Sequence, residues 1–117
     1  KTQNTPFFQA KLRYNLNPQF SVTFNWKDYK RYKNLYPEID IYFWVKWIPI
    51  KFQNQNGIIK VNPMQGVWKV PFNSLMKLIE SNKYPLHSYY QRVYDNKGNA
   101  KSSYVIEITD QAFKKVI

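Results

Sequence analysis

The fold of this chain is decided by the stretch IDIYFWVKW at residues 39–47. β-branched and aromatic residues dominate this stretch, and such residues favour the pleated, half-buried surface of a strand. We therefore expect a strand here, at a central position of a sheet. Of the four tryptophans, we expect Trp44 and Trp68 in the core, and Trp26 and Trp47 at the surface beside basic residues.

Shorter elements flank this strand on both sides. Alternating apolar and polar side chains predict strands at residues 8–13, 20–26 and 103–108, and a hairpin formed by strands at 58–61 and 67–70. Helical spacing predicts short helices at 27–35 and 72–82 and at the C-terminus, the second capped by Asn73 and the third by Thr109 or Asp110. This order of elements indicates an α/β or α+β class, with a mixed central sheet of about five to six strands flanked by two or three short helices.

Length and composition narrow the class of protein. The 117 residues suit one domain, and 22 aromatic residues argue against a disordered chain. The absence of cysteine excludes disulfide scaffolds, thiolate nucleophiles and Cys-ligated zinc. No apolar run approaches the roughly 20 residues of a membrane helix, and no secretory signal is visible. We therefore expect an intracellular protein of a bacterial cytoplasm or an organelle matrix, neither secreted nor bound to a membrane.

The charge of the chain points to a polyanionic partner. Eighteen basic and seven acidic residues give a net charge of +11, and both halves of the chain carry the excess. Nucleic acid is the usual partner of so basic a domain, and we expect DNA rather than RNA. Lysine greatly outnumbers arginine, so an AT-rich genome is an alternative source of the same composition.

Two segments hold most of the residues expected to contact nucleic acid. Residues 26–33 interleave cations with aromatic rings, which suits contacts to phosphates and bases. Residues 86–103 combine a histidine, cations, amides and hydroxyl groups, although an exposed hairpin is an alternative interpretation of that segment. The predicted contacts are Arg13, Lys27, Lys30, Arg31 and Lys33 in the first half of the chain and His87, Gln91, Arg92, Lys97, Asn99 and Lys101 in the second.

The triplet Gln9-Ala10-Lys11 suggests a specific chemistry. On the predicted strand at 8–13, the side chains of Gln9 and Lys11 share one face of the sheet. This triplet, with the basic-aromatic segment and the strand that follow it, resembles the core of the PD-(D/E)XK nuclease superfamily of restriction and homing endonucleases. The resemblance implies a Mg²⁺-dependent phosphodiesterase, in which Gln9 holds the metal or the attacking water and Lys11 polarises the scissile phosphate.

The chain departs from the family pattern at one point. The family's leading Asp lies upstream of the triplet, and none of the eight residues before Gln9 is acidic. Either the half that carries this Asp lies upstream of Lys1 or on another chain, or the domain is not a working nuclease. Asp40 offers a substitute carboxylate for the metal if its strand neighbours the triplet strand. Gln9 and Lys11 on the solvated face of an ordinary strand remain the alternative.

Three functions are therefore compatible with the sequence. The first is a DNA-binding, nuclease-like domain that contains the whole of residues 1–117 and is truncated at its N-terminus. The second is a non-enzymatic basic protein of a nucleoprotein particle, such as an organellar ribosome from an AT-rich genome. The third is a subunit of a homodimer or larger protein assembly, in which the aromatic residues serve as interface anchors.

Overall fold

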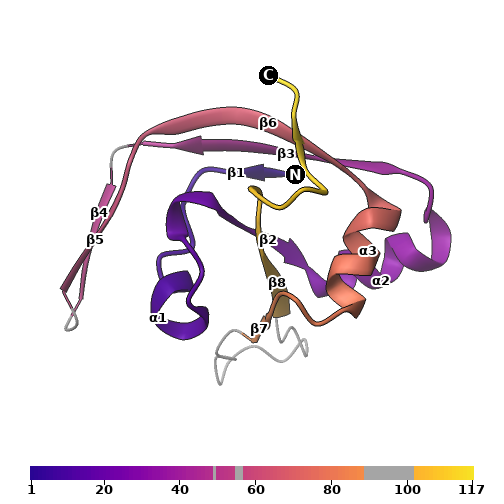
Figure 1. The fold of residues 1–117 in the computed structure, drawn as a ribbon, viewed down its shortest axis with the longest axis horizontal. Helices are drawn as coiled ribbons and strands as arrows, with labels where there is room; N and C mark the ends of the chain where they lie inside the picture. Colours follow the sequence, from indigo (N-terminus) through magenta and orange to yellow (C-terminus); the bar gives the residue numbers. More distant parts are fainter. Residues whose placement is uncertain (49, 55–56, 89–101) are drawn as a thin grey trace, which may run out of the picture.

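A computed structural model describes residues 1–48, 50–54, 57–88 and 102–117, and confirms the mixed α/β class. Its strands are distributed over three sheets, of four, three and two strands among these residues, instead of the single central sheet that the sequence suggested. Figure 1 shows two of these sheets as layers: a long, curved sheet lies across the top of the view, and a smaller sheet lies below it.

The long sheet, sheet A, is built on the strand that the opening stretch predicts. This strand, β3 (Asp40–Trp47), pairs antiparallel with β6 (Met64–Pro71), and Trp44 lies opposite Val67. Two short strands complete the order β1-β3-β6-β9: β1 (Thr2–Gln3) runs parallel to β3, and β9 (Lys114–Lys115) runs antiparallel to β6. The predicted central strand is confirmed.

The hairpin between β3 and β6 differs from the predicted one. Strand β5 (Gly57–Val61) pairs with β4 (Ile50–Asn54), a strand that the sequence analysis missed. The expected pairing of residues 58–61 with residues 67–70 is therefore wrong, because the second of these segments belongs to β6 and pairs with β3. Each segment is nevertheless a strand, as predicted.

Sheet B forms the second layer. It consists of β2 (Ser21–Asn25), β8 (Ser102–Glu107) and β7 (Leu86–Ser88), in the order β2-β8-β7 with antiparallel pairs. The predicted strands at 20–26 and 103–108 are thus confirmed. They are distant in the sequence but directly paired, so sheet B joins the first and last quarters of the chain.

The α-helices lie at the two ends of these layers (Figure 1). Helices α2 (Trp26–Leu35) and α3 (Phe72–Glu80) lie at one end and confirm two predictions. The N-cap of α3 is Pro71, with no side-chain hydrogen bond, so the predicted cap at Asn73 is wrong. Helix α1 (Ala10–Tyr14) lies at the other end, followed by the short 3₁₀ helix η1 (Pro18–Phe20).

Residues 8–13 do not form the predicted strand. They lead into and form helix α1, which ends at Asn15 with a left-handed φ of 55°, a conformation that asparagine tolerates. In such a strand Leu12 would share the apolar side with Phe8 and Ala10, but here it is 53% exposed. The alternation over six residues was too short to distinguish a strand from a single turn of helix buried only at Ala10.

The predicted C-terminal helix is also absent, so that prediction is wrong. The side chain of Asp110 accepts a hydrogen bond from the backbone N–H of Ala112 at 3.1 Å, and the N–H of Phe113 bonds to the carbonyl of Asp110 at 3.0 Å. These bonds close a turn, so the cap residue satisfies a local turn instead of starting a helix. The chain then continues as β9.

The core fills the space between the two sheets. Phe24 of β2 packs against Phe43 of β3 with ring centroids 6.1 Å apart, and Phe72 of α3 closes the cluster. The predicted places of two tryptophans are exchanged: Trp47 is buried at 2% exposure, whereas Trp44 is 55% exposed. The indole N–H of Trp47 donates to the carbonyl of Gln19 at 2.8 Å, which removes the cost of burying that polar group.

Candidate nucleic-acid interface

Helix α2 places the densest group of predicted contacts on one surface. It begins at Asn25, whose side-chain oxygen accepts hydrogen bonds from the backbone N–H groups of Lys27 and Asp28 at 2.8 and 3.3 Å. Its inner side is held by Tyr29, which is buried, and by Tyr32, which packs on Phe72 at 6.1 Å. These contacts fix which side of the helix faces solvent.

The outer side of α2 is basic. Lys27, Lys30, Arg31 and Lys33 are exposed, and the first three follow the i, i+3, i+4 spacing of a single helical stripe. The Lys30 ammonium lies 4.4 Å from the ring centroid of Trp26, so a ring accompanies the cations, as the sequence pattern predicted. We call these four cations, with Trp26, the α2 basic face.

Two carboxylates neutralise part of this face. Asp28 pairs with Lys1 and, at 3.3 Å, with Arg31, and Glu80 of α3 pairs with Lys33 at 2.9 Å. The hydrogen bond between Lys33 and Glu80 raises the pKa of the lysine and lowers the pKa of the glutamate, so both stay charged at neutral pH. Counting Lys1, five cations face two acids, and the surface keeps an excess of positive charge.

The two proposed catalytic residues do not share a face. Gln9 is the N-cap residue of α1 and Lys11 lies in its first turn, and side chains two positions apart in a helix point to different sides. Lys11 Nζ donates to Asn15 Oδ1 at 2.9 Å. The strand geometry on which the triplet argument rested is therefore absent.

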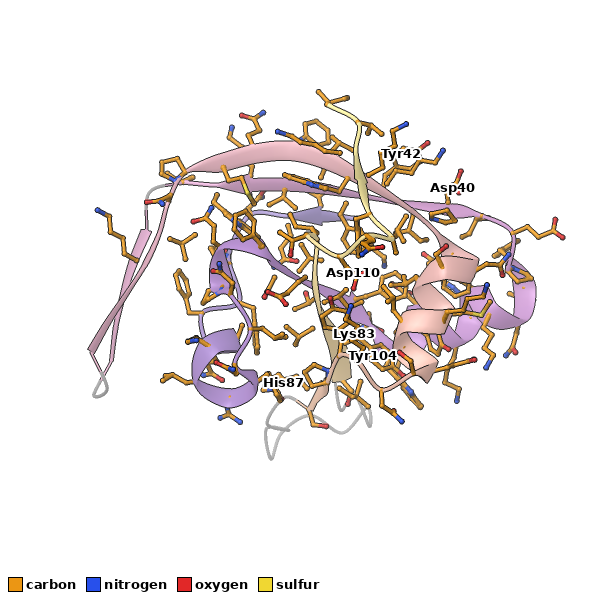
Figure 2. All side chains as sticks on the ribbon, in the orientation of Figure 1. Asp40, Tyr42, Lys83, His87, Tyr104 and Asp110 are labelled. Atoms are coloured by element: carbon orange, nitrogen blue, oxygen red, sulfur yellow. The ribbon has the colours of Figure 1, made fainter. Side chains whose placement is uncertain are left out.

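Asp40 also lies away from the triplet. It is exposed at the start of β3 and forms an ion pair with Lys69 at 3.4 Å. Figure 2 shows it at the side of the molecule opposite α1. Asp40 and the triplet thus lie in separate parts of the molecule, and among the described residues no three His, Asp or Glu side chains gather as a group that could hold a metal.

His87 lies inside the protein. It is 6% exposed, its Nδ1 lies 2.7 Å from the hydroxyl of Tyr14, and its ring meets Phe7 edge-on at 4.9 Å. Burial, with the charge of Arg13, lowers the pKa of His87. A neutral, buried ring gives no support to the predicted phosphate contact, and its observed role is to attach α1 to β7. Arg13 itself is exposed on α1.

The remaining predicted contacts cannot be placed. Gln91, Arg92, Lys97, Asn99 and Lys101 all lie in the segment 89–101, outside the described residues. Their proposed role in base reading stays a prediction.

The sequence analysis missed a second exposed surface. On the side of sheet A that faces away from sheet B, β3 exposes Tyr42 and Trp44, at 48% and 55% exposure. Figure 2 shows Tyr42 projecting from this outer side. The three consecutive rings at residues 42–44 were the available signal, because successive side chains on a strand point to opposite faces and some of these rings must therefore point away from the core.

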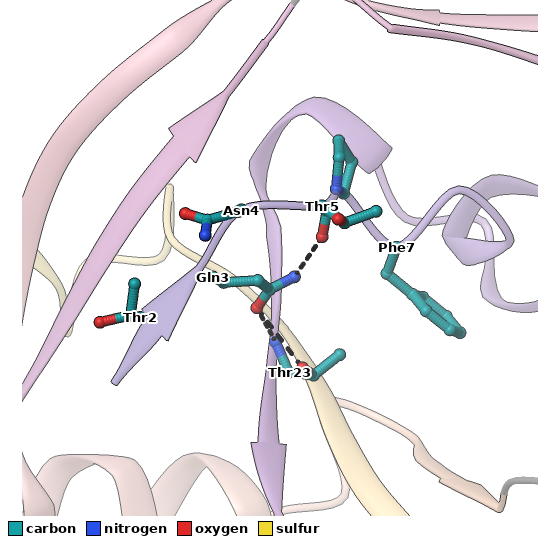
Figure 3. A pocket seen from close by; sticks show the side chains of 7 residues that line it. Thr2, Gln3, Asn4, Thr5, Phe7 and Thr23 are labelled. Atoms are coloured by element: carbon teal, nitrogen blue, oxygen red, sulfur yellow. Dashed lines mark hydrogen bonds between the residues drawn. The ribbon is translucent and has the colours of Figure 1, made fainter.

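A hollow between β1 and β2 lies where the side chain of Gln3 connects the two strands (Figure 3). The amide oxygen of Gln3 accepts the backbone N–H of Thr23 at 3.0 Å, and its amide nitrogen donates to the carbonyl of Thr5 at 3.0 Å. The amide oxygen thus holds β1 against β2, the amide nitrogen fixes the chain just after β1, and the residues that line the hollow include no charged group.

Comparisons with known protein families, with curated proteins and with solved structures find no match for this chain. Among the described helices, none is long and apolar enough to cross a membrane.

Proposed function

We propose that the protein binds nucleic acid, and DNA rather than RNA, through the α2 basic face. One observation carries the proposal: a capped, well-packed helix presents Lys27, Lys30, Arg31 and Lys33 on its outer side beside Trp26. Such a surface supports phosphate contacts because a rigid element holds several exposed cations close together, and these cations outnumber the two carboxylates beside them. The net charge of +11 adds a long-range attraction for any polyanion.

A titration with a labelled DNA duplex at two salt concentrations tests the proposal. Each phosphate that the protein neutralises releases counterions, so affinity should fall steeply between about 50 and 200 mM salt. Weak binding that does not depend on salt would contradict the proposal and favour a protein partner. An RNA duplex of the same length, titrated in parallel, tests the preference for DNA and the alternative of a ribosomal or other ribonucleoprotein subunit.

The double variant Lys27→Ala/Lys30→Ala locates the surface. We expect it to reduce the slope of log affinity against log salt by about two, one for each lost phosphate contact. The control Lys11→Ala/Lys60→Ala removes the same charge from exposed positions on α1 and β5. Equal losses in both double variants would show that only net charge matters, and the α2 basic face would lose its assignment.

A separate assay tests the nuclease hypothesis, which includes Mg²⁺ as cofactor and Gln9, Lys11 and Asp40 as site residues. The assay is nicking of a supercoiled plasmid with and without Mg²⁺, using the chain together with any segment that precedes it in the gene. The helical placement of Lys11 leads us to expect no change in nicking on Lys11→Ala. Loss of Mg²⁺-dependent nicking in this variant alone would restore the triplet to the mechanism.

A further inference from the structure

The outer face of sheet A carries aromatic and basic side chains in ordered rows. Tyr42 of β3 lies opposite Lys69 of β6, which in turn lies opposite Lys114 of β9. The next row places Trp44 opposite Val67, and the row after that places Lys46 opposite Gln65. Directly paired residues share one side of a sheet, so these seven side chains form one surface, which we call the outer platform.

Both rings of the outer platform are open to solvent although each is large enough to anchor a core. Tyr42 and Trp44 are about half exposed, whereas all four residues on the other side of β3 are buried. Beside Trp44 runs an apolar groove of about 560 Å³, whose lining includes Gln65, Val67 and Ile117. This volume is within the range of small-molecule sites.

The charge around the rings favours an anionic ligand. Lys69 lies opposite Tyr42, Lys46 lies two positions beyond Trp44 on the same strand, and Lys114 lies one strand further, opposite Lys69. Asp40, an acid at the start of β3, is paired with Lys69 at 3.4 Å. An aromatic surface bordered by cations attracts a ligand that combines flat apolar rings with negative charge. Nucleic acid has that combination, and in it the rings are the bases.

We propose that the outer platform binds unpaired nucleotides, with bases stacked on Trp44 and Tyr42 and phosphates beside Lys46, Lys69 and Lys114. Single strands are the class that fits, because the faces of paired bases are covered by their neighbours in a duplex and cannot stack on a protein ring. Side chains two positions apart on a strand stand about 6.6 Å from each other, roughly twice the 3.4 Å base spacing of a duplex. The two rings thus match bases drawn apart along an extended strand.

This inference rests on the proposed function in that both take nucleic acid as ligand, but it concerns a different surface. The α2 basic face lies at one end of the layers, whereas the outer platform lies on the side of sheet A that faces away from sheet B (Figures 1 and 2). A protein with both surfaces would hold a duplex at α2 and an adjoining single strand at the sheet.

The test uses two probes, an oligothymidylate that forms no duplex and a fully paired DNA hairpin. We expect Trp44→Ala to weaken binding of oligothymidylate by about 5- to 150-fold, the value of one base–ring stack, and to leave hairpin binding within about two-fold. Trp44→Phe should retain most of the affinity because it keeps a ring. Tyr36→Ala is the matched control, since Tyr36 is also about half exposed but lies at the end of α2, off the sheet.

Tryptophan fluorescence gives a second readout that does not depend on affinity. Trp44 is the one tryptophan of the described chain with more than half of its surface exposed, so stacking of a base should quench its emission. Trp44→Phe should remove the part of the quenching that comes from Trp44 while the protein still binds. Unchanged affinity for oligothymidylate in a folded Trp44→Ala protein, or quenching in Trp44→Phe equal to that of the wild type, would overturn the inference and indicate that this face binds a protein partner.

The two proposals fail in different ways. If wild-type protein binds the hairpin but not oligothymidylate, the outer platform loses its ligand and the α2 basic face keeps its own. If it binds oligothymidylate through Trp44 but the α2 variants bind the hairpin normally, the outer platform keeps its ligand and the α2 basic face loses its own. Binding of neither probe at low salt would overturn both.

Discussion

Strand β3 has two faces of similar aromatic content that meet different surroundings. On the inner face Ile41, Phe43, Val45 and Trp47 are all buried, with at most 6% exposure. On the outer face the ring of Tyr42 is 48% exposed and that of Trp44 is 55% exposed. The difference lies in what covers each face, because sheet B and the helices pack only on the inner one.

The comparison shows that an aromatic residue on a strand is not by itself evidence of a core. Burial of a large ring stabilises the fold by a few kcal/mol, and a chain that leaves such a ring in solvent forgoes this gain. On β3 the exposed rings lie among lysines, where they are available to a ligand. The following substitutions test how far the two faces differ.

The largest effect is expected on the inner face, from Phe43→Ala. Phe43 is 1% exposed and contacts the rings of Phe24 at 6.1 Å and Phe113 at 5.7 Å, so its removal leaves a cavity in the core. We expect the free energy of unfolding to fall by about 3–5 kcal/mol. Urea unfolding followed by circular dichroism measures it, and a loss below about 1 kcal/mol would mean that the two sheets are not packed as described.

Gly66→Ala should have the next largest effect. Gly66 lies on the inner side of β6, where an added Cβ would come within 2.9 Å of the Trp68 ring and of Lys115 Cε. The lysine can move, but the ring is part of the core, so we expect destabilisation by about 1–3 kcal/mol. Thermal unfolding measures the change. A neutral result would contradict the close approach of Trp68 to the β6 backbone.

A smaller effect on stability is expected at Asp110, in the turn whose Phe113 packs on Phe43 at the inner face of β3. Burial opposes the charge of Asp110, but hydrogen bonds from Lys83, Tyr84 and the Ala112 N–H outweigh it and lower the pKa of the carboxyl group. A lowered pKa in the folded state contributes stability above the unfolded value, near 4, and this contribution is lost as pH falls through the folded value.

Asp110→Asn therefore tests how much the charged carboxylate stabilises this turn. We expect the variant to lose about 1–2 kcal/mol at pH 7, the usual worth of hydrogen bonds to a charged group. As the pH falls from about 4 through the lowered pKa of the folded state, the wild type should approach the variant, since its carboxyl group becomes protonated. Denaturant unfolding at pH 7 and at about pH 3 measures both values, and an equal difference at the two pH values would rule out this role of the carboxylate.

The smallest effect on stability is expected on the outer face, from Trp44→Ala. More than half of this ring is already in water, so its removal should change the free energy of unfolding by less than about 0.5 kcal/mol. The same denaturant titration that is applied to Phe43→Ala provides the measurement. A loss comparable to that of Phe43→Ala would show that the outer face is covered in solution, for instance by a second copy of the chain.

The candidate site was predictable from the sequence only in part. Residues 26–33 are basic and aromatic in a pattern that also fits a helix, so Lys27, Lys30, Arg31 and Lys33 could be assigned to one exposed element correctly. The outer platform could not, because it depends on which residues of β6 and β9 lie beside Tyr42 and Trp44. Such pairings join positions far apart in the chain, and no local pattern specifies them.

The sequence by itself determined the class of the fold and its strongest elements. The dense β-branched and aromatic run at 39–47, the alternation in 20–26 and 103–108 and the helical spacing in 27–35 and 72–82 all correspond to observed elements, because each pattern matches the geometry of one element over enough residues.

Tertiary structure alone decided the rest. Periodicity divides β3 into two faces but does not say which one is covered, and this choice put Trp47 in the core and Trp44 in solvent. Short segments were decided in the same way: residues 8–13 became helix α1, and the end of the chain became a turn and β9. In such segments local preferences differ by only a fraction of a kcal/mol per residue, so contacts with distant parts of the chain determine the conformation.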